Sequence, residues 1–310
     1  MEYTKPIIKW VGGKTQIIDR IVPLIPTEIY NYWEPFVGGG SVLLAVCDLV
    51  AAKKLCISGN IYASDINPKL IGLYKTIQSH PNELNTAILT LSNEYLACSN
   101  DKLPSSRGIK WSEISKIDAA SMGKEGYYYW TRERFNREPA NTVNSAAMFV
   151  FLNKTCFRGL YREGPNGFNV PFGNYTNPSI CDPDHILHIS VLIRPVIFEC
   201  RSFAEIFTLT VSGDFIYFDP PYAPETINSF VSYTADGFTD ADHITLFENI
   251  KNVSNKGVTA LMSNSHVQSV LDAFKLYEII PVECRRRINS KSPESTTMEV
   301  LVRIPSMMMR

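Results

Sequence analysis

The tetrapeptide Asp219-Pro220-Pro221-Tyr222 combines residue types that suit chemistry on a planar molecule. The apolar run 215–218 before it predicts a buried strand, so the Asp219 carboxylate is expected at the carboxyl end of that strand. The two prolines fix φ and remove two backbone donors, which leaves the Pro220 carbonyl beside the carboxylate as a second acceptor. Two acceptors followed by an aromatic ring suit a flat ligand with an NH2 group, such as an adenine base. A proline turn without a catalytic role is the alternative for the tetrapeptide taken alone.

Length and composition indicate an ordinary globular enzyme. The chain of 310 residues can hold one large α/β domain with a sizeable insertion, and 45% of its residues are hydrophobic and 20% charged. A net charge of −1 argues against a general basic coat for nucleic acid, although a local basic cleft is compatible with it. The 7 cysteines are scattered, without a Cys-x-x-Cys pair, which favours reduced thiols and no metal site. We expect an intracellular, soluble protein, because no signal-peptide pattern and no apolar run of about 18 residues is present.

Two glycine-containing stretches near the start of the chain could bind a ligand. Trp10 and Lys14 flank a glycine pair, and Lys14 is expected to open an amphipathic helix that continues to Ile21. The stretch 32–42 reads as a strand, a loop with three glycines at 38–40, and then a helix. It is neither Gly-x-Gly-x-x-Gly nor a P-loop, so phosphate is not the indicated ligand.

A second predicted strand, 61–64, ends at Asp65. A carboxylate there could bind the hydroxyl groups of a ribose. Asp65 or Asn67 could equally cap the helix expected at 69–78, and the two roles are compatible. The glycine loop and the acid together favour a cofactor that contains a nucleoside.

The α/β pattern is interrupted from about residue 75 to residue 195, where we expect an inserted domain. Helices are predicted at 82–97 and 144–153, and the polar stretch 99–125 is expected to be a surface excursion. In the stretch 153–173, two short strands are predicted on either side of a Gly-Pro-Asn-Gly turn. A basic, aromatic hairpin of this kind suits the major groove of DNA. A solvated hairpin is the alternative.

The last third of the chain returns to alternating strands and helices. Strands are predicted at 196–199, 258–263, 276–280 and 298–304, and Thr239 is expected to cap a helix that extends to Ile250. The stretch 285–291 carries four positive charges that could meet phosphates, unless it is a solvated loop. A capping or structural role is favoured for the isolated His266.

Taken together, these motifs resemble the Dam-like DNA adenine methyltransferases over nearly the whole chain. The match includes the stretch 9–14, the glycine loop, Asp65, the hairpin, Asp219 to Tyr222 and the basic stretch. It implies an α/β fold: a Rossmann-like methyltransferase sheet formed by residues 1–74 and 196–310, with an inserted, mainly helical target-recognition domain at 75–195 that carries a β-hairpin. It also implies S-adenosylmethionine as methyl donor and double-stranded DNA, with a flipped adenine, as substrate.

The resemblance also implies three sets of site residues. The catalytic set is Asp219, Pro220 and Tyr222. The cofactor set is Trp10, Lys14, Phe36, Gly38, Gly40, Asp65, Ile66, Phe203 and Asp219. The DNA-binding set is Lys9, Lys154, Phe157, Arg158, Leu160, Arg162, Arg285 and Arg287. Arg158 stands where many GATC enzymes have asparagine and favours a different partner, so the resemblance does not imply GATC as the target, and the sequence does not give the recognition site.

Two other functions remain open from the sequence. One is methylation of RNA adenine or of a protein amide, since paired acceptors recognise any planar amino group; the basic hairpin argues against protein. The other is a DNA-binding module with a degenerate cofactor pocket, against which the glycine loop, Asp65 and Asp219 speak. A monomer is favoured. The sequence does not distinguish restriction protection from replication or repair marking or from the marking of a viral genome.

Overall fold

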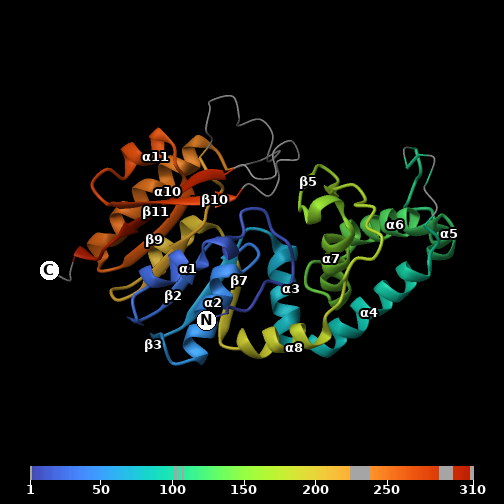
Figure 1. Cartoon of the computed structure of the whole chain (residues 1–310), viewed down its shortest axis with the longest axis horizontal. Coiled ribbons are helices and arrows are strands. Elements are labelled where there is room, and N and C mark those ends of the chain that lie inside the picture. The colour runs from blue at the N-terminus through green and yellow to red at the C-terminus, as the bar shows by residue number, and fades with distance from the viewer. Residues whose placement is uncertain are drawn as a thin grey trace. The chain divides into compact units, whose positions relative to one another are not determined.

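The computed structural model describes residues 2–100, 103, 105–106, 108–223, 238–285 and 296–307. The chain forms two compact units (Figure 1). The first consists of Met1–Lys5, Gly13–Ile66 and Pro195–Arg310, and the second of Pro6–Gly12 and Asn67–Arg194. The helix α3 (Pro68–Ser79), which the expected boundary at residue 75 would divide, lies within the second unit.

The first unit is built on a mixed sheet in the order β10-β11-β9-β8-β2-β4-β7. Its strands are β2 (Tyr32–Glu34), β4 (Ile61–Asp65), β7 (Val196–Cys200), β8 (Phe215–Phe218), β9 (Thr259–Ser265), β10 (Glu278–Arg285) and β11 (Thr296–Ile304). The pairs from β9 to β7 are parallel, and β11 is antiparallel to both of its neighbours. A separate parallel pair joins β1 (Glu28–Ile29) to β3 (Cys56–Ile57).

Strand β8 is buried on both faces, as its apolar run predicts. Ile216 and Phe218 face a core completed by the helices α9 (Ile206–Leu209), α10 (Asp240–Val253) and α11 (Gln268–Ala273). The capping box that Thr239 forms with Asp242 starts α10, as the sequence predicts. The helix α2 (Ser41–Ala51) and the short turns η4 (Phe203–Glu205) and η6 (Ser254–Lys256) complete the unit.

The predicted amphipathic helix from Lys14 to Ile21 is wrong as a single element. The stretch is divided into η1 (Lys14–Gln16), α1 (Ile18–Ile21) and η2 (Val22–Leu24), and Ile17 leaves helical geometry between the first two. Lys14 and the isoleucines at 17, 18 and 21 are all buried, as the predicted apolar stripe requires. The Lys14 N–H donates to Ser41 Oγ, 2.9 Å away.

The topology places a ligand crevice at a defined point. Strands β2 and β8 are neighbours, but the chain continues from β2 to β4 on one side and from β8 to β9 on the other. In open α/β sheets ligands bind outside the carboxyl ends of the strands at such a switch point. Glu34 ends β2, and Asp219 directly follows β8.

The second unit is mainly helical. Beside α3 it contains α4 (Pro81–Ala97), α5 (Lys116–Ser121), α6 (Gly123–Arg137), α7 (Val143–Thr155), α8 (Pro183–Leu192), the turn η3 (Phe157–Gly159) and the hairpin strands β5 (Glu163–Gly164) and β6 (Gly167–Phe168). The almost completely buried α7 packs against α3, α4 and α6. The helices predicted at 82–97 and 144–153 and the hairpin are confirmed.

Three helices of this unit were not predicted: α5, α6 and α8. In α6, the tyrosines at 127–129 are buried and the arginines at 132, 134 and 137 follow within the next eight residues, so apolar and charged residues do not separate into one helical stripe. Part of the expected excursion at 99–125 is therefore helical.

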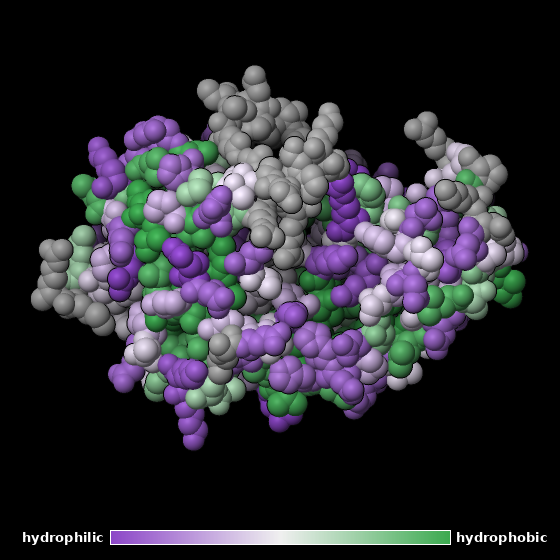
Figure 2. All heavy atoms as spheres, viewed as in Figure 1, coloured by the Kyte–Doolittle hydropathy of each residue, from purple (hydrophilic) through white to green (hydrophobic). Residues whose placement is uncertain are grey.

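On the face shown in Figure 2, hydrophilic and hydrophobic residues are interspersed over the described part of the chain. None of the described helices is both long and apolar enough to span a bilayer.

Candidate active site

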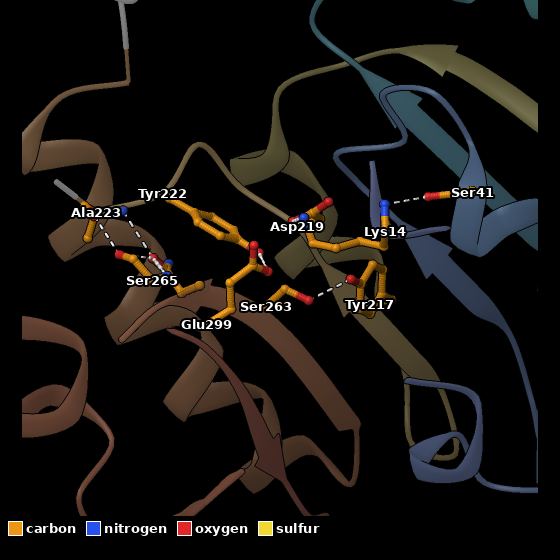
Figure 3. A network of polar contacts seen from close by, with 10 residues as sticks. Lys14, Ser41, Tyr217, Asp219, Tyr222, Ala223, Ser263, Ser265 and Glu299 are labelled. Atoms are coloured by element: carbon orange, nitrogen blue, oxygen red, sulfur yellow. Dashed lines mark hydrogen bonds and ion pairs between the residues drawn. The ribbon is translucent and has the colours of Figure 1, made fainter. Parts of the chain in front are cut away.

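The Asp219 carboxylate forms a buried ion pair with Lys14. Lys14 Nζ lies 2.8 Å from Asp219 Oδ1, with the side chains 3% and 19% exposed respectively (Figure 3). Burial raises the pKa of Asp219 to about 6; the Lys14 ammonium opposes that rise, and the charge of Glu299 adds to it. The carboxylate is therefore a desolvated acceptor whose charge depends on its neighbours.

The same ammonium group also faces the ring of Tyr222. Lys14 Nζ lies 4.7 Å from the ring centroid, which is within the range of a cation–π interaction. The Tyr222 hydroxyl donates a hydrogen bond to Glu299 Oε2, 2.6 Å away. A nitrogen that carries N–H donors is thus held between the carboxylate and the aromatic ring of the tetrapeptide.

Neutral, hydrogen-bonded groups support this pair from the strands. Glu34 is buried and accepts a hydrogen bond of 2.6 Å from the Tyr32 hydroxyl. Burial raises the pKa of Glu34 to about 8, so this carboxyl group is largely protonated around neutral pH. The Tyr217 hydroxyl forms a hydrogen bond of 2.6 Å with Ser263 Oγ. The charge at this edge of β2 and β8 therefore rests mainly on Asp219 and Lys14.

The end of β9 holds the backbone that follows the tetrapeptide. The Ala223 N–H donates to Asn264 Oδ1 at 3.0 Å, and the Ser265 hydroxyl donates to the Ala223 carbonyl (Figure 3). Asn264 is completely buried. These contacts fix the point where the chain leaves Tyr222.

A second group of predicted site residues lies at the carboxyl ends of β2, β4 and β7. The Gly38 N–H donates to Asp65 Oδ2 at 3.2 Å, and Gly38 and Gly40 have φ of +46° and +75°, which favours glycine. Phe36 stacks on Phe203 with 5.4 Å between ring centroids.

Next to Asp65, the Ile66 side chain is 78% exposed. A carboxylate, an exposed apolar side chain and stacked aromatic rings are groups that fit a nucleoside, which needs hydroxyl acceptors and an apolar face. The predicted cofactor residues Phe36, Gly38, Gly40, Asp65, Ile66 and Phe203 all lie in the first unit.

Trp10 and Lys9 belong to the second unit, whereas Lys14 belongs to the first. Trp10 stacks on Tyr161 with 5.2 Å between ring centroids. Asn153 binds the Lys9 backbone twice, through its amide nitrogen and its oxygen, each at 2.8 Å. The opening motif is thus divided between the units, a division that the sequence pattern did not reveal.

The predicted DNA-binding residues of the second unit lie in and before the hairpin. Arg158 adopts φ of +58°, and its N–H donates to the Tyr175 hydroxyl at 2.9 Å. Arg162 Nε donates to Asn169 Oδ1 at 2.6 Å. Phe157 is 45% exposed.

The remaining predicted DNA-binding residues differ in their surroundings. Leu160 is partly exposed. Burial and the nearby Lys9 charge lower the pKa of Lys154. Arg285 is the last residue of β10, and Arg287 lies outside the described residues.

Several residues of the site were missed by sequence reasoning. Glu299, Asn264 and Ser265 contact the tetrapeptide or its next residue, and Asn169 and Tyr175 hold the two hairpin arginines. Among these residues, only Asn264 and Ser265 had a local signal. They belong to the polar triplet 263–265 at the end of a predicted strand, where hydrogen-bonding side chains are expected at the edge of the sheet.

The fold and the site define a class. A mainly parallel sheet with β11 reversed, a glycine loop after β2 and an acid at the end of β4 define a Rossmann-like α/β fold. Residues 10–288 match the family described as D12 class N6 adenine-specific DNA methyltransferase, and the chain belongs to this family.

Relatives resemble the chain over nearly its whole length. It is 36% identical to the type II methyltransferase M.MjaIII of Methanocaldococcus jannaschii, over 93% of both chains. It is 30% identical to the type II methyltransferase M1.LlaDCHI of Lactococcus lactis, over 93% of this chain and 90% of that one. It is 28% identical to a DNA adenine methylase of Vibrio cholerae, over 93% and 91%. Family membership confirms the resemblance and establishes site-specific adenine methylation in DNA, in preference to RNA or protein amides.

Proposed function

We propose that this enzyme transfers a methyl group from S-adenosylmethionine to the N6 amine of an adenine flipped out of a DNA duplex, with Asp219, Pro220 and Tyr222 as the catalytic groups. A base inside a duplex cannot reach a buried carboxylate, so it has to be extruded at a cost of a few kcal/mol. Stacking on Tyr222 would offset about 1–3 kcal/mol of that cost.

The contact between Lys14 and Asp219 carries this proposal. The ammonium is an N–H donor 2.8 Å from the carboxylate and 4.7 Å from the Tyr222 ring centroid. An extruded adenine needs the same two partners: a carboxylate that accepts from its amino group and an aromatic ring on which it stacks. The base amine would therefore displace the ammonium from Oδ1 or use the second carboxylate oxygen.

The acceptors make a poor nucleophile reactive. The lone pair of the adenine amine is conjugated with the ring, so it is weakly available. Hydrogen bonds to Asp219 and to the Pro220 carbonyl would draw the nitrogen towards tetrahedral geometry and localise that lone pair. The Asp219 charge would then stabilise the positive charge that develops on nitrogen. Alignment of the two reactants would supply much of the remaining acceleration.

S-adenosylmethionine would supply the electrophilic methyl group. Asp65 would hold the ribose, Ile66 and Phe203 would contact the adenine of the cofactor, and Phe36, Gly38 and Gly40 would surround its remaining part. Trp10 and Lys14 are proposed for the methionine part. A calorimetric titration tests this: a functional enzyme should bind S-adenosylmethionine with or without DNA, whereas a degenerate DNA-binding module should bind it in neither case.

The second unit is proposed to recognise double-stranded DNA through Lys9, Lys154, Phe157, Arg158, Leu160 and Arg162, with Arg285 and Arg287 at phosphates. We propose a recognition sequence other than GATC, because Arg158 offers a different donor set from asparagine. The names of the type II relatives favour a role in restriction-modification. We further propose that the enzyme is a monomer located where the genome lies. Sequencing of methylated adenines in DNA from cells that express the protein would identify the target.

Replacement of Arg158 or Arg162 by alanine should change sequence choice more than general affinity. A base-reading arginine contributes about 1–3 kcal/mol of discrimination. Arg162 is held by Asn169 in one orientation, which suits a base reader. The ratio of the Kd for a scrambled duplex to the Kd for the target duplex, measured at one salt concentration, should fall about tenfold or more in each variant.

The matched control for these variants is Arg137→Ala. Arg137 is an exposed arginine of the same unit, paired with Glu133 at 2.7 Å. Its replacement should leave the ratio unchanged. Equal weakening on both duplexes in the Arg158 or Arg162 variants would mark them as phosphate contacts instead.

The rate of methylation should fall as pH falls through about 6. Only the ionised Asp219 carries the charge that stabilises the positive charge developing on the amine, and its pKa is raised from the ordinary 3.8 to about 6. Besides burial, Lys14 and Glu299 act on the pKa of Asp219, and the Asp219 charge in turn raises the pKa of the neighbouring Glu34, Tyr217 and Tyr222. The profile of kcat/KM for DNA, which reports the free enzyme, should therefore rise through that pH to a plateau.

The Lys14→Met variant tests the origin of this pH dependence. Removal of the ammonium removes the interaction that lowers the pKa of Asp219, so the acid limb should move to higher pH. The position of the limb, rather than the height of the plateau, is the relevant result. A wild-type profile that stays flat down to about pH 5 would contradict the role of an ionised Asp219.

A further inference from the structure

A carboxylate on a distant strand holds the aromatic ring of the tetrapeptide. The Tyr222 hydroxyl donates to Glu299 Oε2 at 2.6 Å, across 77 residues of sequence. A separation near 2.6 Å is typical of a charge-assisted O–H···O⁻ hydrogen bond, which is roughly twice as strong as a neutral one. Figure 3 shows the Glu299 side chain rising from its strand towards the end of the tyrosine ring.

The sheet register explains why Glu299 reaches this position. Glu299 of β11 is paired with Ser265 of β9. The Ser265 hydroxyl binds the Ala223 carbonyl, and the neighbouring Asn264 binds the Ala223 N–H. One cross-strand pair thus supports both the side chain of residue 222 and the backbone of residue 223.

This arrangement restricts the ring at both ends. A tyrosine ring turns about χ1 and χ2, and its plane decides whether a base can stack on it. With the backbone fixed by Asn264 and Ser265 and the hydroxyl fixed by Glu299, the ring retains little freedom. The Lys14 ammonium faces the ring 4.7 Å from its centroid.

The charge of Glu299 has a second effect on the ring. It helps to raise the pKa of Tyr222 well above its usual value, together with burial and the Asp219 charge. The phenol therefore stays protonated and remains a donor. The Cys284 thiol also contacts Glu299, and burial and this carboxylate raise the pKa of Cys284 to about 12.

We propose that Glu299 is a positioning residue for methyl transfer, which fixes the plane of Tyr222 so that the extruded adenine stacks with its amine at Asp219. This rests on the proposed role of Tyr222. Glu299 acts through the tyrosine hydroxyl and does not touch the substrate. If Glu299 served only to stabilise the antiparallel pair of β10 and β11, the effect of its replacement would not depend on the Tyr222 hydroxyl.

The test is a double-mutant cycle with Glu299→Ala and Tyr222→Phe, measured on the duplex identified by methylation sequencing. Glu299→Ala should lower kcat/KM about tenfold, the loss expected for one hydrogen bond to a charged group. In the Tyr222→Phe background the same change should add little further loss, because the hydroxyl is already absent. Glu299→Gln should recover most of the activity, since its amide oxygen can accept the phenol hydrogen.

A second readout reports the stacked base directly. With 2-aminopurine at the target position, the fluorescence of the enzyme–DNA complex should differ between wild type and Glu299→Ala, while S-adenosylmethionine binding should stay equal. Glu278→Ala is the control: Glu278 is an exposed carboxylate of the same hairpin, 3.4 Å from Arg303. This variant should match the wild type in every readout.

Additive losses in the cycle would overturn the proposal, as would wild-type kcat/KM in a folded Glu299→Ala variant. Should Glu299→Ala not fold, Glu299→Leu takes its place in the cycle, because leucine fills a similar volume but offers no acceptor to the tyrosine hydroxyl. Tyr222→Ala separates this inference from the proposed function. Wild-type activity in Tyr222→Ala would refute the role of Tyr222 itself, whereas a loss there combined with no loss in Glu299→Ala would refute only the role of Glu299.

Discussion

Replacement of Asp219 by alanine is expected to abolish methyl transfer, with a loss in kcat of about 1,000-fold or more. The variant loses the acceptor for the amine hydrogen and the negative charge that stabilises the developing positive charge on nitrogen. The measurement is incorporation of labelled methyl groups into DNA at saturating S-adenosylmethionine. Asp219→Asn keeps an acceptor oxygen but not the charge, so its activity should lie between those of the alanine variant and the wild type.

Two controls make this result specific. Asp219→Ala removes the ion pair of the buried Lys14 ammonium, so thermal unfolding must be measured and the rates compared well below the melting temperature. Asp272→Ala removes an exposed carboxylate of the same unit, hydrogen-bonded to Gln268 at 2.9 Å, and should retain full activity. A folded Asp219→Ala enzyme with the wild-type rate would show that the assignment of the catalytic carboxylate is wrong.

The sequence revealed those parts of the site that depend on local patterns. The four apolar residues of β8 placed Asp219 at a strand end, and the short strand before Asp65 did the same for the acid of the cofactor loop. Both predictions are of the same physical kind: the hydrophobic run defines the buried strand, and the first polar residue after it lies at the edge. The capping box at Thr239 could also be read locally, because it involves residues three positions apart.

The parts that the sequence did not reveal depend on contacts between distant segments. Lys14 was expected only at the cofactor, but the fold brings it to Asp219, which is more than half the chain away. Glu299 is a single glutamate within an alternating strand, and only the register of β11 against β9 shows that it reaches Tyr222. Hydrophobic periodicity fixes which face a residue occupies, but not which partner it meets across a sheet.

The contacts of Asp214 also join segments that are distant in the sequence, and their loss is expected to lower the stability of the fold. This aspartate immediately precedes β8 and is 1% exposed. Asp214 Oδ1 accepts hydrogen bonds from the Asn31 N–H at 3.1 Å and from the Asn31 side-chain amide at 2.8 Å. Asp214 Oδ2 accepts from Trp33 Nε1 at 2.8 Å and from the Val211 N–H at 3.0 Å. One carboxylate therefore ties the start of β8 to β2, the two strands that carry Asp219 and Glu34 at their other ends.

Asp214→Ala is expected to lower the free energy of unfolding by about 3–5 kcal/mol, because several buried donors lose a charged acceptor at once. Asp214→Asn should lower it too, since its amide would turn an N–H group towards donors. Urea unfolding measures the change, with Asp272→Ala expected within about 0.5 kcal/mol of the wild type. Because Asp214 lies at the amino end of β8, away from the ligand edge, the folded variant should keep its kcat at low temperature. Loss of kcat without loss of stability would instead place Asp214 in the catalytic machinery and contradict its role as a structural tie between the two strands.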